Sequence, residues 1–146
     1  MAPRLDMKTA NPAAYRAMVA LNRHVETCGL EHRLLELVKM RASQINGCAY
    51  CLEMHGRLLR EAGERPERLD LLAAWREAPG FTARERAALA WTEALTLLPQ
   101  TGAPDAAYAE ALQAFGEKEL VDLSLAIVLI NGWNRLMAGF RAQPGS

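Results

Sequence analysis

The chain lacks an excess of charge of either sign and lacks any apolar run long enough to cross a membrane. Its 17 lysine and arginine residues equal its 17 aspartate and glutamate residues, so no basic surface is predicted for nucleic acid or anionic lipid. The longest apolar stretch, Leu123 to Ile130, is far shorter than the roughly 20 residues that span a bilayer. The N-terminal segment also lacks the apolar core of a signal peptide. We expect a soluble, cytoplasmic protein with no nucleic-acid or membrane partner.

Cysteine is scarce as well. Three cysteines without an export signal do not form a disulfide framework, because a reducing compartment keeps such bridges open. Two of them, Cys48 and Cys51, are nevertheless only three positions apart, which indicates redox chemistry or metal binding. The 146 residues fit one domain, residues 1–146, without a repeat, a low-complexity tract or a linker.

Sustained two-residue alternation of apolar and polar side chains is absent too, which argues against strands. Apolar residues recur at helical spacing, and helix starts are indicated at Asn11-Pro12, at Pro66 and at Thr82 with Glu85. We therefore predict an all-α fold of six or seven helices. Their approximate ranges are 12–27, 31–45, 48–62, 66–78, 82–99, 105–115 and 117–141.

The last predicted helix differs from the others because residues 125–130 are apolar on every side. A helix on the surface of a monomer normally has one polar face. This helix is therefore expected to be central to the core or shared between subunits.

The most informative stretch runs from Asn46 to His55. At about 100° per residue, Cys48, Cys51 and His55 fall within one sector of roughly 120° on the apolar face of the predicted helix. Unsatisfied N–H groups and the dipole at a helix start stabilise a thiolate, and a nearby histidine accepts or returns the proton. This spacing also permits a disulfide. The pattern predicts a reactive dithiol.

Other interpretations of the same residues stay open. Cys48 and Cys51 could be small buried side chains beside a core histidine. Zinc could be bound by Cys48, Cys51 and His55, with Cys28 or His24 as the fourth ligand, although structural zinc sites usually combine two paired spacings and only one is present. A thioredoxin-like domain shares the cysteine spacing but requires strands.

The run from Glu36 to His55 resembles the core motif of AhpD-like alkylhydroperoxidases, within the carboxymuconolactone decarboxylase superfamily. Residues 81–91 and 129–136 resemble the same proteins, so the likeness covers most of the chain. The resemblance implies a single AhpD-like helical domain with its core motif at 36–55, assembled as a homo-oligomer, either a trimer or a hexamer. We expect neither a cofactor nor a metal.

The function that the resemblance implies is reduction of a hydroperoxide by the cysteine pair. Cys51 corresponds to the cysteine that attacks the O–O bond, and Cys48 to the one that resolves the sulfenic acid into a disulfide. An external dithiol or thiol reductase then returns the pair to its reduced form. His55 and Glu36 correspond to a proton relay. Resolution of a sulfenic acid to a disulfide is ordinary thiol chemistry.

The chain departs from AhpD itself at Tyr50, which stands where AhpD has a histidine beside the second cysteine, and it resembles the shorter, single-unit members. The position of Glu36 on the helical wheel also conflicts with the role that the resemblance implies for it. It lies opposite Leu34 and Val38, which predicts an exposed carboxylate, whereas the resemblance implies that another helix or subunit covers it.

Two alternative functions remain. A cofactor-free decarboxylase of the muconolactone type would share the fold, but that branch is not marked by a cysteine pair. A non-enzymatic, redox-responsive or zinc-holding assembly protein is the other. Cys28 is predicted to be a bystander thiol, and His24 and His32 are predicted to be surface residues.

Overall fold

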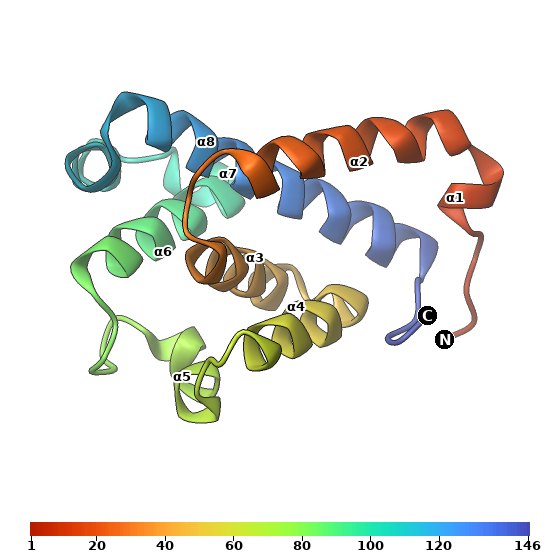
Figure 1. Ribbon diagram of the computed structural model, residues 1–146, viewed down its shortest axis with the longest axis horizontal. Helices are drawn as coiled ribbons and strands as arrows, with labels where there is room; N and C mark the ends of the chain where they lie inside the picture. Colours follow the sequence, from red (N-terminus) through yellow and green to blue (C-terminus); the bar gives the residue numbers. More distant parts are fainter.

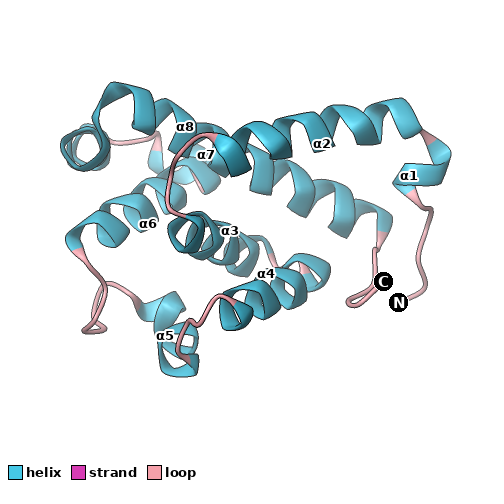
Figure 2. Ribbon diagram, in the orientation of Figure 1, coloured by secondary structure: helices cyan, strands magenta, loops and turns pink.

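The computed structural model describes residues 1–146, and all its regular elements are helices (Figures 1 and 2). The all-α prediction is therefore confirmed. The elements are α1 (Met7–Ala10), α2 (Pro12–Thr27), α3 (His32–Asn46), α4 (Ala49–Glu61), α5 (Pro66–Leu71), a 3₁₀ turn η1 (Leu72–Ala74), α6 (Ala83–Thr96), α7 (Leu98–Thr101) and α8 (Asp105–Phe140).

The eight α-helices exceed the six or seven predicted. Both α1 and α7 have four residues, which is too short for apolar periodicity to show. The fourth predicted helix, 66–78, was too long, since α5 ends at Leu71 and continues only as the 3₁₀ turn.

Helix boundaries follow local hydrogen-bonding chemistry. The Asn11 side chain accepts a hydrogen bond from the N–H of Ala14, and Pro12 fills the first turn of α2. Thr82 and Glu85 form a reciprocal capping box at the start of α6. These boundaries are as predicted.

Helix α3 lies at the centre of the fold and contacts α4, α6 and α8 (Figure 1). Two apolar clusters fill the space around it. The first joins α2, α3, α6 and α8 and includes Val25, Leu34, Val38, Trp91 and Ile127. The second joins α3, α4, η1 and α6 and includes Leu37, Leu59, Leu72, Trp75 and Leu89. Since both clusters include α3 residues, the apolar core holds this helix on several sides.

Helix α8 is two helical segments meeting at Gly116, whose backbone is non-helical (φ 73°, ψ 174°), at the predicted stop. The second segment is central, with Ile127, Leu129 and Ile130 at most 1% exposed, although Val128 is 57% exposed. By length and composition α8 could also cross a membrane, but core helices pass the same test, and 44% of its most apolar window is buried. It is therefore weak support for a membrane span.

The backbone at Gly116 leads to a first prediction. Gly116→Ala should lower the free energy of unfolding by about 1–3 kcal/mol, because this φ/ψ region is essentially restricted to glycine. No atom lies within 4 Å of an added Cβ, so the cost is conformational. Urea denaturation measures it. The matched control is Gly139→Ala in the same helix, where a Cβ also meets nothing within 4 Å. We expect this control to be neutral or stabilising, and equal losses in both variants would contradict the prediction.

Candidate active site

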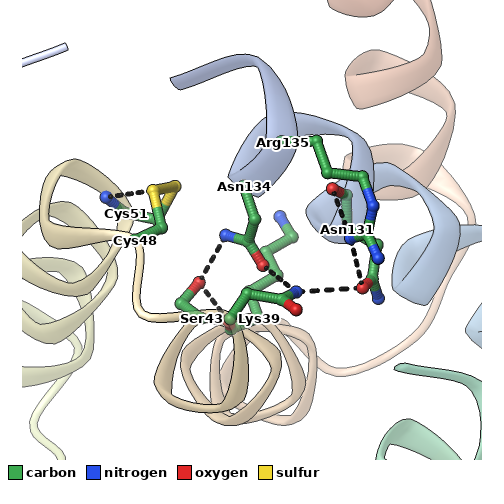
Figure 3. Close-up of a disulfide and its surroundings, with 8 residues drawn as sticks. Lys39, Ser43, Cys48, Cys51, Asn131, Asn134 and Arg135 are labelled. Carbon is green, nitrogen blue, oxygen red and sulfur yellow. Dashed lines mark hydrogen bonds between the residues drawn. A yellow bond between two sulfur atoms is a disulfide. The ribbon is translucent and has the colours of Figure 1, made fainter. Parts of the chain in front are cut away.

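The two cysteines lie at the N-terminus of α4. Cys48 is the N-cap residue, and its sulfur accepts a hydrogen bond from the N–H of Cys51 at 3.3 Å. The Cα atoms are 5.3 Å apart, and the two sulfurs are joined as a disulfide (Figure 3). Both residues are 1% exposed. The predicted proximity of the pair to a helix start is therefore present in the structure.

A tight turn between α3 and α4 places Cys48. Gly47 ends α3 in the left-handed conformation (φ 67°), and the N–H of Cys48 donates to the carbonyl of Ser43 at 3.2 Å. The left-handed residue reverses the chain without the steric penalty that a Cβ would bring. The end of one helix thus directly positions the first sulfur of the next.

A buried polar network fastens this turn to α8 (Figure 3). The Asn46 amide donates to the side-chain oxygens of Asn131 at 3.0 Å and Asn134 at 2.9 Å. Asn134 in turn donates to the hydroxyl of Ser43 at 3.0 Å. Because hydrogen bonds have specific geometry, this network fixes how α3 and α8 meet beside the disulfide.

Glu36 and His55 form a buried pair between α3 and α4. Glu36 Oε2 lies 2.6 Å from His55 Nδ1, and the residues are 3% and 7% exposed. The wheel-based prediction of an exposed Glu36 is wrong because α4 packs over this side of α3. A single chain is enough to bring Glu36 beside His55.

The ionisation of Glu36 defines the tautomer of His55. Burial opposes ionisation of the carboxyl, but the hydrogen bond from His55 and the favourable electrostatic effects of His55, Lys39 and His32 outweigh it. The pKa of Glu36 therefore lies below its usual value of 4.5. A carboxylate only accepts, so His55 donates through Nδ1. Nε2 has no hydrogen-bond partner within the chain. Every fully buried side-chain nitrogen of the protein has such a partner, so Nε2 is not fully buried and reaches accessible space.

A cavity of about 210 Å³ lies against the second cysteine, between α2, α4 and α8. Cys51 and His55 form part of its wall, and Cys48 does not. Asn22 is the other polar side chain there, and the remaining lining residues are Tyr15, Val19, Tyr50, Met54, Trp133 and Met137. The structure therefore brings one cysteine and one imidazole to a mostly apolar chamber.

The other candidate residues lie elsewhere. Cys28 is half-buried, and its thiol donates to the carbonyl of Val25. His24 and His32 are exposed as predicted, and His24 contacts Asp122 at 3.0 Å. No three His, Cys, Asp or Glu side chains are arranged to hold a metal ion, so the proposed zinc set of Cys48, Cys51 and His55 with Cys28 or His24 does not form. A larger cavity, about 600 Å³, is lined mainly by ion-paired arginine and glutamate and contains no thiol.

The fold and the site together define a class: all-helical proteins with a cysteine pair at a helix N-terminus beside a buried His–Glu pair. The chain belongs to the carboxymuconolactone decarboxylase family, whose model matches residues 12–94, and within that superfamily it is AhpD-like.

Relatives agree with this assignment. The chain is 35% identical over 136 residues to the uncharacterized protein YdfG of Bacillus subtilis (strain 168), covering 93% of this chain and 92% of YdfG. It is similar to the crystal structure of a protein of unknown function from Agrobacterium tumefaciens, provisionally assigned as the antioxidant defence protein AhpD, with a TM-score of 0.96, 42% identity and 99% coverage of both chains. The debrominase Bmp8 shares the fold, with a TM-score of 0.84, 18% identity, and coverage of 94% of this chain and 74% of Bmp8.

Sequence reasoning missed Lys39 and the cavity wall supplied by α2. Lys39 is 4% exposed, and its ammonium lies 3.5 Å from Glu36 Oε1. Its position three residues after Glu36, on the same face of α3, was the available signal. The cavity wall formed by α2, which includes Tyr15 and Asn22, had no such signal in the sequence, because α2 reaches the site only through tertiary packing.

The polar network leads to a second prediction. Asn134→Leu should lower the free energy of unfolding by about 1–3 kcal/mol, because Asn46 and Ser43 each lose a buried partner. Urea denaturation with an unchanged m-value measures this loss. The matched control is Gln113→Leu on the same helix, an exposed amide, for which we expect a change within about 0.5 kcal/mol. A loss no larger than that of the control would show that the network contributes nothing.

A third prediction concerns pH. The folded-state pKa of Glu36 is lowered, so the ionised carboxylate stabilises the fold above the unfolded pKa, and this contribution is lost as the pH falls through the folded pKa. The stability of the wild type relative to Glu36→Gln should therefore decline as the pH falls below about 5. Denaturation at a series of pH values measures the difference. Glu53→Gln, which removes half of a surface pair with Arg57, is the control and should show no comparable decline.

Proposed function

We propose that residues 1–146 act as a single AhpD-like domain that reduces organic hydroperoxides with the Cys48/Cys51 pair and an external dithiol or thiol reductase. The observation that carries this proposal is the shared cavity wall: Cys51 and His55 face the same mostly apolar chamber of about 210 Å³. The chamber suits a small apolar molecule carrying a reactive polar end.

In the proposed first step, the Cys51 thiolate attacks the distal oxygen of the hydroperoxide. The O–O bond breaks, Cys51 becomes a sulfenic acid, and the alkoxide leaves. His55 accepts the thiol proton through Nε2 and returns it to the alkoxide, which departs as an alcohol. Glu36 holds the imidazole through Nδ1 at 2.6 Å, so Nε2 is the nitrogen available for this transfer.

In the second step, Cys48 attacks the sulfenic sulfur, water leaves and the disulfide forms. An external thiolate then enters the cavity and attacks the Cys51 sulfur. Cys48 is displaced as a thiolate at the N-cap of α4, where the N–H of Cys51 already donates to its sulfur. A second thiol of the donor then attacks the mixed disulfide between the donor and Cys51, which releases the reduced enzyme. The position of Cys48 therefore favours it as the leaving group.

The predicted homo-oligomer, either a trimer or a hexamer, stays part of the proposal. Val121 and Val128 are 66% and 57% exposed on α8, and Leu98 of α7 is 50% exposed. Apolar side chains exposed along a largely apolar helix favour a covering partner.

A second candidate uses the same cavity. Tyr15 and Trp133 pack edge to face with ring centroids 6.0 Å apart, and Tyr50 adds a third aromatic ring to the wall. This lining favours a planar aromatic ligand. Reductive removal of halogen from such a ligand by the dithiol, as the name of the debrominase Bmp8 suggests for that protein, is therefore the alternative.

The test of the main proposal measures consumption of cumene hydroperoxide coupled to dithiothreitol. We expect turnover by the wild type, only the uncatalysed rate for Cys51→Ser, which lacks the attacking thiol, and lowered turnover for Cys48→Ser, whose sulfenic acid must be reduced by dithiothreitol directly. Cys28→Ser is the matched control and should retain wild-type turnover, since Cys28 lies outside the cavity. After peroxide treatment, Cys48→Ser should carry a dimedone-reactive sulfenic acid at Cys51.

Several outcomes would overturn the proposal. Activity that survives both substitutions would exclude the dithiol. A sulfenic acid that forms on Cys48 in Cys51→Ser but not on Cys51 in Cys48→Ser would show that Cys48, and not Cys51, attacks the peroxide. Release of bromide from a bromopyrrole without peroxide turnover would favour dehalogenation. Lactone turnover that resists thiol alkylation would favour the muconolactone-type decarboxylase.

A further inference from the structure

Lys39 is a buried charged residue that pairs with Glu36 and that the proposed cycle leaves unused. Its side chain is 5% exposed, and its single ion pair is to Glu36 Oε1 at 3.5 Å. Lys39 is placed on α3 one turn before Ser43, whose hydroxyl donates to the Lys39 carbonyl at 2.7 Å (Figure 3). Burying an ammonium group costs free energy unless the group is paired, so the pair with Glu36 is what makes the buried position of Lys39 tolerable.

The Glu36 carboxylate serves two cationic partners at once. One oxygen lies 2.6 Å from His55 Nδ1, and the other lies 3.5 Å from Lys39 Nζ. If the ammonium were absent, the buried carboxylate could gain a compensating positive charge only by keeping the imidazole protonated. With Lys39 present, the carboxylate has a second cationic partner, so it does not depend on the imidazole alone for a balancing charge.

We propose that Lys39 is a positioning residue that balances the charge of Glu36 and thereby keeps His55 neutral and able to accept the proton of Cys51. The inference rests on the proposed function, since it assigns His55 the role of proton acceptor. Lys39 acts through Glu36 and not on the substrate, because it does not line the cavity.

The other groups around His55 do not supply this charge. From α3, His55 contacts Glu36, and Glu36 in turn pairs with Lys39; His32 at the start of α3 has the smallest electrostatic effect on Glu36. Beyond Cys51, the titratable side chains of the cavity are Tyr15 and Tyr50, and a tyrosine carries no positive charge in either protonation state. The α8 wall contributes Trp133 and Met137, neither of which titrates. Besides the imidazole, Lys39 is therefore the cationic side chain that pairs with Glu36.

The test is an NMR titration of the His55 imidazole in protein labelled at histidine, with His55→Gln identifying its signal. In Lys39→Met, loss of a nearby positive charge should raise the midpoint of the His55 titration by about one pH unit. Lys39→Arg retains the charge and should titrate close to the wild type.

The matched control uses a similar arrangement at the surface. Lys118 and His24 share Asp122 at 3.0 Å each, so Lys118→Met should leave the His55 midpoint unchanged. Lys39→Gln removes the same charge and replaces Lys39→Met if that variant does not fold. An unshifted His55 midpoint in the folded neutral variant, or equal shifts in Lys39→Met and Lys39→Arg, would overturn the inference. The titration needs neither peroxide nor reductant, so an inactive protein with a shifted midpoint would refute the proposed function alone.

Discussion

The site depends on keeping one carboxylate ionised inside a helical core. Glu36 is 3% exposed, and an unpaired charge at that depth would be costly. It is tolerated because α4 supplies an imidazole and α3 itself supplies an ammonium. The α3–α4 packing and the carboxylate therefore require each other: the packing hides the charge, and the charge orients the imidazole towards the cavity.

The cysteine pair depends on a different element, the turn that joins these two helices. A left-handed Gly47 and the Ser43 carbonyl place Cys48 as the cap of α4, and the Asn46 amide holds the turn to α8. This turn therefore connects the sulfur chemistry to α8, which also forms one wall of the cavity. The thiols, the imidazole and the cavity are thus fixed by helices that all meet around α3.

Much of this arrangement could be predicted from local sequence signals. The helical class, the capping box at Thr82, the stop at Gly116 and the position of the pair at the start of a helix all follow from neighbouring residues. The burial of Glu36 could not be derived in this way, because the wheel reports one helix alone and α4 covers the side that looks polar. The cavity wall contributed by α2 was also missed, since Tyr15 and Asn22 come near Cys51 only after folding. Lys39 was visible three residues after Glu36, but its importance depends on the same hidden packing.

The small volume of the cavity has a kinetic consequence under the proposed function. About 210 Å³ is below the usual size of a ligand pocket, so it admits one small molecule at a time. Both cysteines are only 1% exposed, and Cys51 forms part of the wall of this chamber, so under the proposed function both reactants reach Cys51 through it. The hydroperoxide and the electron donor must therefore enter the cavity one after the other. This is a double-displacement scheme, in which each of the two reactants inhibits the binding of the other.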